Sequence, residues 1–306
     1  MSEEMESKVP ALPRAFRLAY LDFSSVALED DLQFYTEVMG LKRADESAGG
    51  KAWLTVGSDH HNISLTSGPA QSFDSVGYQL PKGVGLAPME KMLRSEGVKF
   101  VRKSDARPGV PDLLEIEAVG GHVVQLIEDM TTTAKGLPHD GVAPLRLGHF
   151  AVISAEGDRI NKLYRDVLRF HNTDAFGDAV HFYTCNYEHH VFNIVQAPVP
   201  HRLHHVAFQL REYAAHARAA DVLARDGKPI LWGPTRHTAG HNIASYFHDN
   251  SKRLVELYTD MDVYLADLDA MEPRPWHEEI PMRPRKWQRG DLAYWKTKFG
   301  VELSQL

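Results

Sequence analysis

Apolar positions in the second half of the chain follow two periods, one typical of helices and one typical of strands. The spacing of one helical face is carried by Ile160, Leu163, Tyr164, Val167 and Leu168. Runs rich in β-branched and aromatic residues predict strands at about 180–185, 190–196, 203–210, 242–247 and 253–258. A second helix is expected over about 213–226, where Gly227 ends it. The order predicts units of one strand, one helix and three strands.

The first half of the chain repeats several of these segments about 130 residues earlier. Residues 17–20 (RLAY) correspond to 146–149 (RLGH), and residues 34–38 (FYTEV) correspond to 163–167 (LYRDV). Further along, 75–80 (SVGYQL) aligns with 205–210 (HVAFQL), and 122–126 (HVVQL) aligns with 253–257 (RLVEL). Because the offset drifts by only two residues over more than 100, the pattern indicates a tandem duplication.

The stretch between the copies has the composition of a linker. Residues 130–144 read MTTTAKGLPHDGVAP, rich in Thr, Gly and Pro and without apolar periodicity. A chain of 306 residues also suits two domains better than one core. We therefore expect an α+β protein of two domains, 1–143 and 144–306, each built from paired βαβββ modules, with the second forming an incomplete barrel.

Charge and composition narrow the function classes. The net charge of −7 and the pI near 6.2 give no basic footprint, which argues against nucleic acid as a partner. The first residues are acidic and lack an apolar signal core, and no run approaches the length of a membrane span. We expect a soluble, cytoplasmic protein without a membrane partner.

Cysteine and histidine counts bear on metal chemistry. The single cysteine, Cys185, excludes an internal disulfide and a thiolate cluster, so a metal would be held by nitrogen and oxygen. Thirteen of the 17 histidines lie after residue 144. The second copy is therefore the candidate for a metal site.

Three positions that match between the copies change their chemistry together. The first copy has Tyr20, Ser75 and Gln125, and the aligned residues of the second copy are strong metal ligands, His149, His205 and Glu256. Two imidazoles and one carboxylate on one face of a cation leave open positions for substrate and O2, as in non-haem Fe(II) oxygenases. The change predicts a metal site in the second copy.

The tandem pair His204-His205 leaves a choice of ligand, because neighbours on a strand point to opposite faces. His204 shares its face with Val206 and Phe208, which suits the side packed under a helix. His205 is therefore the predicted ligand.

On these residues the chain resembles the type I extradiol dioxygenases of the vicinal oxygen chelate superfamily, most closely those of the catechol 2,3-dioxygenase kind. The stretches that carry the resemblance are 203–208 (LHHVAF), 233–237 (GPTRH) and 246–249 (YFHD), followed by Glu256. His237 precedes Tyr246 by nine residues, and Glu256 follows ten residues later, which fits the family without a gap.

The resemblance implies roles for individual residues. His149, His205 and Glu256 fall on the metal ligands of the family. His190 falls on its acid/base histidine, with His189 as the alternative because the doublet aligns either way. The pair His237 and Tyr246 falls on the residues that hydrogen-bond the substrate hydroxyl and help it to lose its proton.

The resemblance thus implies an oxidoreductase that opens a catechol-type ring beside the diol with O2, uses Fe(II) or Mn(II), and forms a homo-oligomer. Rival activities within the superfamily are a 4-hydroxyphenylpyruvate-type dioxygenase and a glyoxalase-type isomerase. A metal-free binding protein of the bleomycin-resistance kind is a rival from another class. Residues 276–283 (WHEEIPMR) are expected to form a plain surface arm, with a cover over the active-site mouth or a subunit contact as the alternatives. His241 is an open candidate for lining the same pocket.

Overall fold

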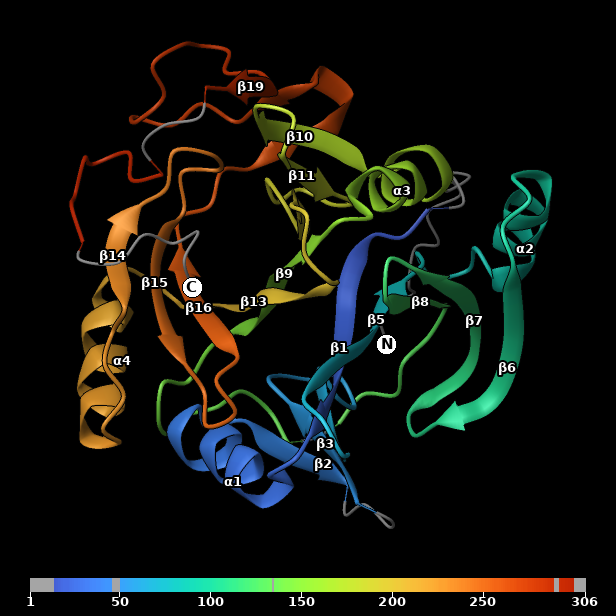
Figure 1. Ribbon diagram of the computed structural model, residues 1–306, viewed down its shortest axis with the longest axis horizontal. Coiled ribbons are helices and arrows are strands. Elements are labelled where there is room, and N and C mark those ends of the chain that lie inside the picture. Colours follow the sequence, from blue (N-terminus) through green and yellow to red (C-terminus); the bar gives the residue numbers. More distant parts are fainter. Residues whose placement is uncertain (1–13, 46–49, 134, 289–291, 300–306) are drawn as a thin grey trace, which may run out of the picture.

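The computed structural model describes residues 14–45, 50–133, 135–288 and 292–299. They form two large curved β-sheets, with helices against their outer sides (Figure 1). Each sheet is made of two βαβββ modules, as the sequence predicts, so the α+β fold class is confirmed. Among the described residues no helix has both the length and the apolar character needed to cross a membrane.

The first sheet has eight strands in the order β2-β3-β4-β1-β5-β8-β7-β6. Its two modules meet where β1 and β5 pair antiparallel, while β4 and β8 lie parallel to β1 and β5 respectively. The strands are β1 (Arg17–Ser25), β2 (Lys42–Asp45), β3 (Lys51–Thr55), β4 (Ile63–Ser67), β5 (Ser72–Gln79), β6 (Phe100–Arg107), β7 (Val110–Val119) and β8 (His122–Ile127).

The second sheet repeats this plan and adds one strand, in the order β14-β15-β16-β13-β9-β12-β11-β10-β19. Here β9 and β13 pair antiparallel at the module junction, and β16 lies parallel to β13. The strands are β9 (Arg146–Ser154), β10 (His171–Phe176), β11 (Val180–Thr184), β12 (Phe192–Gln196), β13 (Arg202–Gln209), β14 (Trp232–Arg236), β15 (Ile243–His248), β16 (Leu254–Thr259) and β19 (Arg285–Trp287). A separate small pair consists of β17 (Tyr264–Leu265) and β18 (Ala270–Met271).

Four α-helices connect strands within the modules, and the first helix of each half runs directly into a π-helical turn. The helices are α1 (Leu28–Gln33), α2 (Leu86–Ser95), α3 (Gly157–Lys162) and α4 (Ala214–Arg225), the π turns are Phe34–Val38 and Leu163–Val167, and Ala266–Leu268 is a short 3₁₀ turn. The apolar face predicted from Ile160 to Leu168 is buried throughout. Helix α4 agrees with the predicted 213–226 to within one residue at each end.

The two halves share buried contacts. One apolar core includes side chains from both halves, and the rings of Phe73 and Phe150 lie 5.2 Å apart across the junction. Beside it, the buried Arg253 Nη1 donates to Asp31 Oδ2 at 2.7 Å and to Asp249 Oδ2 at 3.0 Å. Asp31 belongs to the first half and Asp249 to the second. This ion-pair cluster, Arg253 with Asp31 and Asp249, ties the segment leading into β16 to the first half.

Two features of the fold differ from the sequence expectations. Strand β19 pairs with the edge strand β10, and neither strand shows the alternation that predicts a strand. The expected plain surface arm is wrong for Trp276 and His277, since both donate ring hydrogen bonds to the buried Asp262. A segment with few apolar residues is held here by specific polar contacts, which periodicity does not reveal.

Candidate metal centre

The three predicted ligands converge on the concave side of the second sheet. His149, His205 and Glu256 stand on the neighbouring strands β9, β13 and β16, where Ala207 is the register partner of both His149 and Glu256. His149 Nε2 and His205 Nε2 each lie 3.2 Å from Glu256 Oε2. One donor atom from each residue falls within 4.8 Å of the others, so the structure brings all three together.

The donor atoms at this point suit a divalent cation. All three side chains are buried, and although His205 Nε2 lies 3.2 Å from Glu256 Oε2, the geometry is not that of a hydrogen bond, so this nitrogen has no hydrogen-bond partner among the described residues. Burying a polar nitrogen without a partner is costly, and a cation accepting its lone pair removes that cost. Burial lowers the pKa of His205 well below its usual value, which keeps the ring neutral and able to ligate. The site therefore has the nitrogen and oxygen donors of an iron, manganese or zinc centre.

Glu256 is the common acceptor of this site. Burial raises the pKa of Glu256, but the charge interaction and hydrogen bond with His149 outweigh burial and hold the pKa well below its ordinary value. Asn242 Nδ2 also donates to Glu256 Oε1 at 2.8 Å. The carboxylate is thus ionised at neutral pH, as a ligand must be. Asn242 was missed by the sequence reasoning, although it lies inside the His237 to Tyr246 run that carried the resemblance.

Tyr246 and His237 form a hydrogen-bonded pair beside the ligands. The Tyr246 hydroxyl donates to Glu256 Oε2 at 2.5 Å, and His237 Nε2 lies 3.0 Å from the same hydroxyl. Trp232 stacks on the His237 ring with 4.9 Å between centroids, and the carbonyl of Leu292 lies 3.3 Å from His237 Nδ1. The structure therefore brings both predicted residues to the ligands and fixes the His237 ring on two sides.

His190 and His189 have different surroundings. The His190 ring lines the cavity over the ligands and lies 4.4 Å from the His149 ring, measured between centroids. His189 points the other way, with Nε2 at 3.0 Å from Asp174 Oδ2. Of the doublet, His190 is the residue with access to the cavity.

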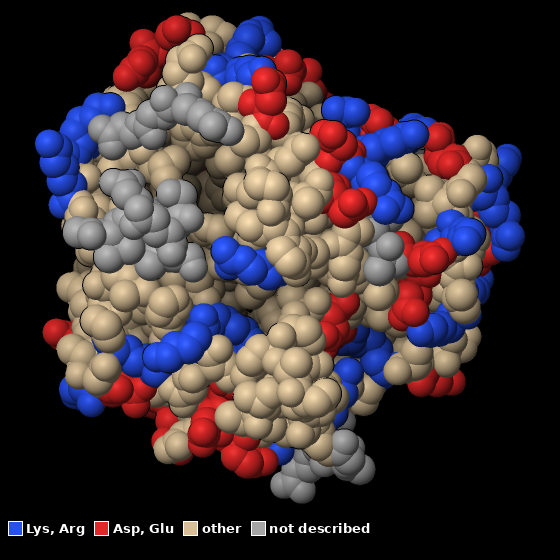
Figure 2. Space-filling view, viewed as in Figure 1, with Lys and Arg blue, Asp and Glu red and all other residues tan. Residues whose placement is uncertain are grey.

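The cavity over the ligands has a volume of about 520 Å³, in the range of small-molecule sites. Figure 2 shows the surface hollowed over the second sheet. Apart from the residues already described and the polar Asn193 and Gln196, the wall is mainly apolar, with side chains from β9 to β12, from the turn after β14 and from the C-terminal segment: Ile153, Phe176, Val180, Phe182, Val195, Ala239 and Leu292. Such a wall suits a largely apolar molecule with a few polar groups at one end.

The structure departs from the expectation for His204. A register shift between Leu203 and His205 interrupts the pairing of β13 with β9. Strict alternation would place His204 under a helix, but the irregularity leaves it half-buried at the cavity, with Nδ1 at 2.8 Å from His205 Nδ1. The prediction that His204 packs away from the site is therefore wrong, whereas the position of His205 agrees with it.

A second His-Asp-His cluster lies apart from the cavity wall. Asp262 Oδ2 is 2.7 Å from His241 Nδ1, and Asp262 Oδ1 is 3.0 Å from His277 Nε2 and from Trp276 Nε1. These atoms satisfy one another by hydrogen bonds, so the cluster fastens the C-terminal segment to the second half. His241, left open by the sequence, belongs to this cluster and is absent from the cavity lining.

The equivalent place in the first half contains an arginine. Arg107 donates to both oxygens of Asp22, at 2.7 and 2.9 Å, and to Gln125 Oε1 at 2.8 Å. Its guanidinium carbon lies 3.6 Å from the centroid of the Tyr20 ring, and Ser75 donates to Asp22. The residues aligned with the metal ligands thus surround a side-chain cation.

A known protein family matches the part of the chain that contains this site. Residues 146–257 match the profile of the Glyoxalase/Bleomycin resistance protein/Dioxygenase superfamily. The matched residues include all three candidate ligands, together with His190, His237 and Tyr246.

Relatives of the whole chain confirm the resemblance to the extradiol dioxygenases. The chain is 26% identical to a biphenyl-2,3-diol 1,2-dioxygenase of Metapseudomonas furukawaii, over 75% of this chain and 81% of that protein. It is 23% identical to a manganese-dependent 2,3-dihydroxybiphenyl 1,2-dioxygenase of Geobacillus genomosp. 3, over 82% of this chain and 86% of that one.

Solved structures share the fold. A Mn(II)-bound glyoxalase from Novosphingobium aromaticivorans has a TM-score of 0.81 at 23% identity and covers 95% of this chain, with 94% of its own chain matched. Homoprotocatechuate 2,3-dioxygenase from Brevibacterium fuscum has a TM-score of 0.80 at 21% identity, over 99% of this chain and 95% of that one. These proteins therefore share the fold of this chain over nearly its whole length.

Proposed function

We propose that this chain is an extradiol dioxygenase, which opens the ring of a catechol-type diol beside its two hydroxyls and inserts both atoms of O2. The observation that carries the proposal is the convergence of His149, His205 and Glu256 at the base of an apolar cavity. The names of the relatives, which include enzymes that act on biphenyl-2,3-diol and on catechols, support it.

A divalent metal fits these residues, and we propose Fe(II), with Mn(II) as the alternative. The same two imidazoles and one carboxylate serve either ion, and a manganese-dependent relative supports the second. When bound, the metal supplies Lewis acidity and the open positions at which the diol and O2 meet.

Tyr246 and His237 are proposed to orient and deprotonate the diol. The Tyr246 hydroxyl, 2.5 Å from Glu256 Oε2 and 3.0 Å from His237 Nε2, stands where a diol oxygen would approach the ligands. A catechol must lose a proton to chelate, and a hydrogen-bonded Tyr–His pair stabilises the resulting oxyanion. Both residues therefore act on the first proton transfer.

His190 is proposed to be the acid/base residue. Its ring borders the cavity beside His149, within reach of a small molecule held over the ligands. Burial lowers the pKa of His190 well below its usual value, so the free ring is neutral and offers a lone pair for a proton. A proton held there can be returned to an oxygen atom of the opening ring.

The two halves of the chain have different roles in this proposal. Residues 144–306 would form the catalytic domain, and residues 1–143 a degenerate copy in which Arg107 stands at the metal position and which supports assembly as a homo-oligomer. A catechol-type diol and O2 would be the reactants.

Rival functions predict different surroundings for the ligands. A glyoxalase-type isomerase shares the fold and a metal, but its reaction does not call for Tyr246, His237 and His190 together around an apolar cavity. A metal-free binding protein would have no use for His205 Nε2, which is buried without a hydrogen-bond partner in the described part of the chain. These residues favour the dioxygenase.

The direct test replaces single ligands. We expect His205→Ala and Glu256→Ala to lose bound metal and to lower O2 uptake with catechol or 2,3-dihydroxybiphenyl by more than about 100-fold, since even outer partners of a metal site cost about 10–100-fold. His248→Ala is the matched control, because this histidine lies on β15 and is absent from the cavity lining. Full O2 uptake by either ligand variant would contradict the site. If metal-loaded wild-type protein forms no ring-opened product from catechol or from 2,3-dihydroxybiphenyl, the proposed function is contradicted.

A further inference from the structure

His189 connects a buried carboxylate to the residue proposed as acid/base. Its Nε2 lies 3.0 Å from Asp174 Oδ2, and its Nδ1 lies 2.9 Å from His190 Nδ1. All three side chains are at most 3% exposed. The contacts form a chain from Asp174 through His189 to His190, which borders the cavity.

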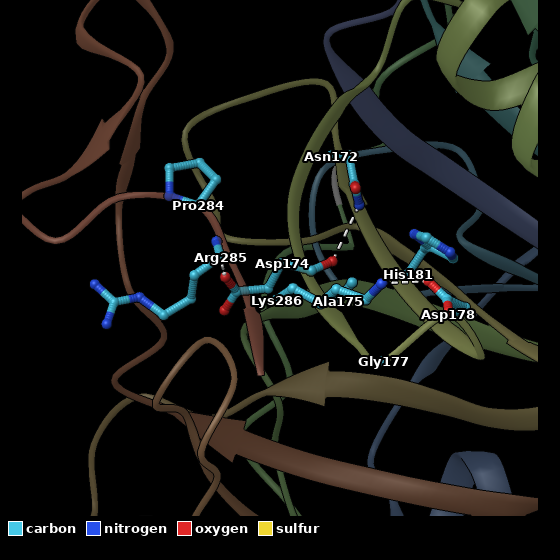
Figure 3. Close-up of a pocket in the computed structure, with 9 residues that line it drawn as sticks. All are labelled: Asn172, Asp174, Ala175, Gly177, Asp178, His181, Pro284, Arg285 and Lys286. Carbon is cyan, nitrogen blue, oxygen red and sulfur yellow. Dashed lines mark hydrogen bonds and ion pairs between the residues drawn. The ribbon is translucent and has the colours of Figure 1, made fainter. Parts of the chain in front are cut away.

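Asp174 acts only as an acceptor in this chain. Besides His189, it receives the indole N–H of Trp287 on Oδ2 at 2.7 Å and the backbone N–H of Arg285 on Oδ1 at 2.9 Å. Figure 3 shows Asp174 at the edge of β10, facing the backbone of Arg285 on β19. The N–H groups of an indole and of the backbone can only donate a hydrogen bond. Both oxygens of Asp174 are therefore occupied by donors, as for an ionised carboxylate.

The donors around Asp174 determine where the protons of the next two rings lie. Because Asp174 only accepts, His189 Nε2 carries hydrogen and donates. A neutral imidazole has one N–H, so His189 Nδ1 is then an acceptor. His190 Nδ1, at 2.9 Å, must donate to it, which leaves His190 Nε2 as the unprotonated nitrogen. Each step follows from hydrogen-bond polarity.

We infer that Asp174 is a positioning residue for His190: acting through His189, it fixes the tautomer in which His190 offers the lone pair of Nε2. The inference rests on the proposed function and extends it to a carboxylate outside the cavity lining. Strand β19 takes part, because Trp287 and Arg285 hold Asp174 in place.

A double-mutant cycle separates this role from a structural one. We expect Asp174→Asn to lower kcat by about 10–100-fold, the usual cost of losing an outer partner, with KM and metal content unchanged. In a His190→Gln background, the same substitution should change kcat by less than about 2-fold, because the residue it orients is gone. Independent, multiplicative losses would overturn the inference. Wild-type activity of His190→Gln would overturn it as well.

Asp262 offers a matched control. Asp262 is equally buried, and it likewise accepts from a histidine and from an indole N–H, those of His241 and Trp276. Its side chain makes no hydrogen bond to His189 or His190 among the described residues, and the 2.9 Å bond that the backbone N–H of His189 donates to the Asp262 carbonyl does not involve the side chain to be replaced. Asp262→Asn should therefore keep kcat within about 2-fold of the wild type. A loss equal to that of Asp174→Asn would mean that loosening the C-terminal segment, and not the tautomer, causes the effect.

A measurement without turnover distinguishes failure of the inference from failure of the proposed function. Metal-free protein labelled with ¹⁵N-histidine reports the protonation of each ring nitrogen, with assignments from His189→Gln and His190→Gln. We expect His189 to be protonated at Nε2 and His190 at Nδ1, and both preferences to weaken in Asp174→Asn. Ring-nitrogen shifts unchanged by Asp174→Asn would overturn the inference even if the enzyme cleaves catechols. The expected shifts would sustain it even if none is cleaved.

Discussion

Replacing Arg107 with methionine should strongly destabilise the first half of the protein. The guanidinium is buried and donates to both Asp22 oxygens and to Gln125, and it lies 2.8 Å from His61 Nε2. Methionine fills a similar volume but leaves the Asp22 charge without the guanidinium and His61 Nε2 without this partner, while Gln125 Oε1 keeps only the Tyr20 hydroxyl as a donor.

The size of the effect follows from burial. Removing one partner of a buried ion pair costs about 3–5 kcal/mol, because the other charge remains desolvated. Arg102 on the same strand provides the control: its side chain is 48% exposed beside Glu90, and Arg102→Met should leave the unfolding free energy close to that of the wild type. Pairing Arg107→Met with Asp22→Asn should recover part of the loss, since the uncompensated charge is then removed.

Urea unfolding followed by circular dichroism at several pH values measures both the magnitude and its cause. Burial raises the pKa of Asp22, but Arg107 outweighs burial and holds the pKa well below its ordinary value. The pair therefore stabilises the wild type above about pH 4, and this contribution is lost as the pH falls below that. In Arg107→Met the carboxyl has a raised pKa, so the difference in unfolding free energy should narrow from pH 7 towards pH 4. A variant within about 1 kcal/mol of the wild type at pH 7 would refute the reasoning.

Three further predictions concern the site and the core. In Gly148→Ala the new Cβ would clash with the Tyr258 hydroxyl, directly before the ligand His149 in the sequence. We therefore expect metal affinity, measured by titration, to fall about 10–100-fold. Unchanged affinity would contradict this close approach. Burial, with a contribution from His201, lowers the pKa of His122 to about 3, so its neutral form favours folding and stability should decline as the pH falls from about 6.5 towards 3. His122→Gln should flatten that decline in urea unfolding between pH 7 and 5, and an equally steep profile would count against it. Chelation should lower the melting temperature, and Fe(II) or Mn(II) at about 100 times its Kd should restore about 2.7 kcal/mol, whereas a melting temperature indifferent to metal would argue against a buried site.

The repeat made the fold and the convergence of ligands predictable. His149, His205 and Glu256 occupy matching places in duplicated modules, and the register of neighbouring strands brings them together. Their convergence could therefore be predicted from the sequence alone. The helical face of the second half was also predictable, because the apolar residues that define its period, from Ile160 to Leu168, are all buried.

The features that sequence reasoning missed depend on irregular or distant contacts. The displacement of His204 comes with a local register shift in β13, which alternation cannot foresee. Arg107 was overlooked because its partners lie on other strands, and Tyr20, Ser75 and Gln125 were considered only as weak metal ligands. The link from Asp174 to Trp287 joins residues far apart in sequence and depends on tertiary packing alone.

The cluster of Arg253 with Asp31 and Asp249 has a consequence for any attempt to divide the protein. A fragment that begins at residue 144 would keep Arg253 and Asp249 but lose Asp31, together with the apolar surface that covers Phe150. The segment leading into Glu256 would then be exposed to water on one side, three residues from the carboxylate. We therefore expect residues 144–306 to be less stable on their own, because the first half supplies Asp31 to the segment that leads into Glu256 and Phe73 to the apolar core around Phe150.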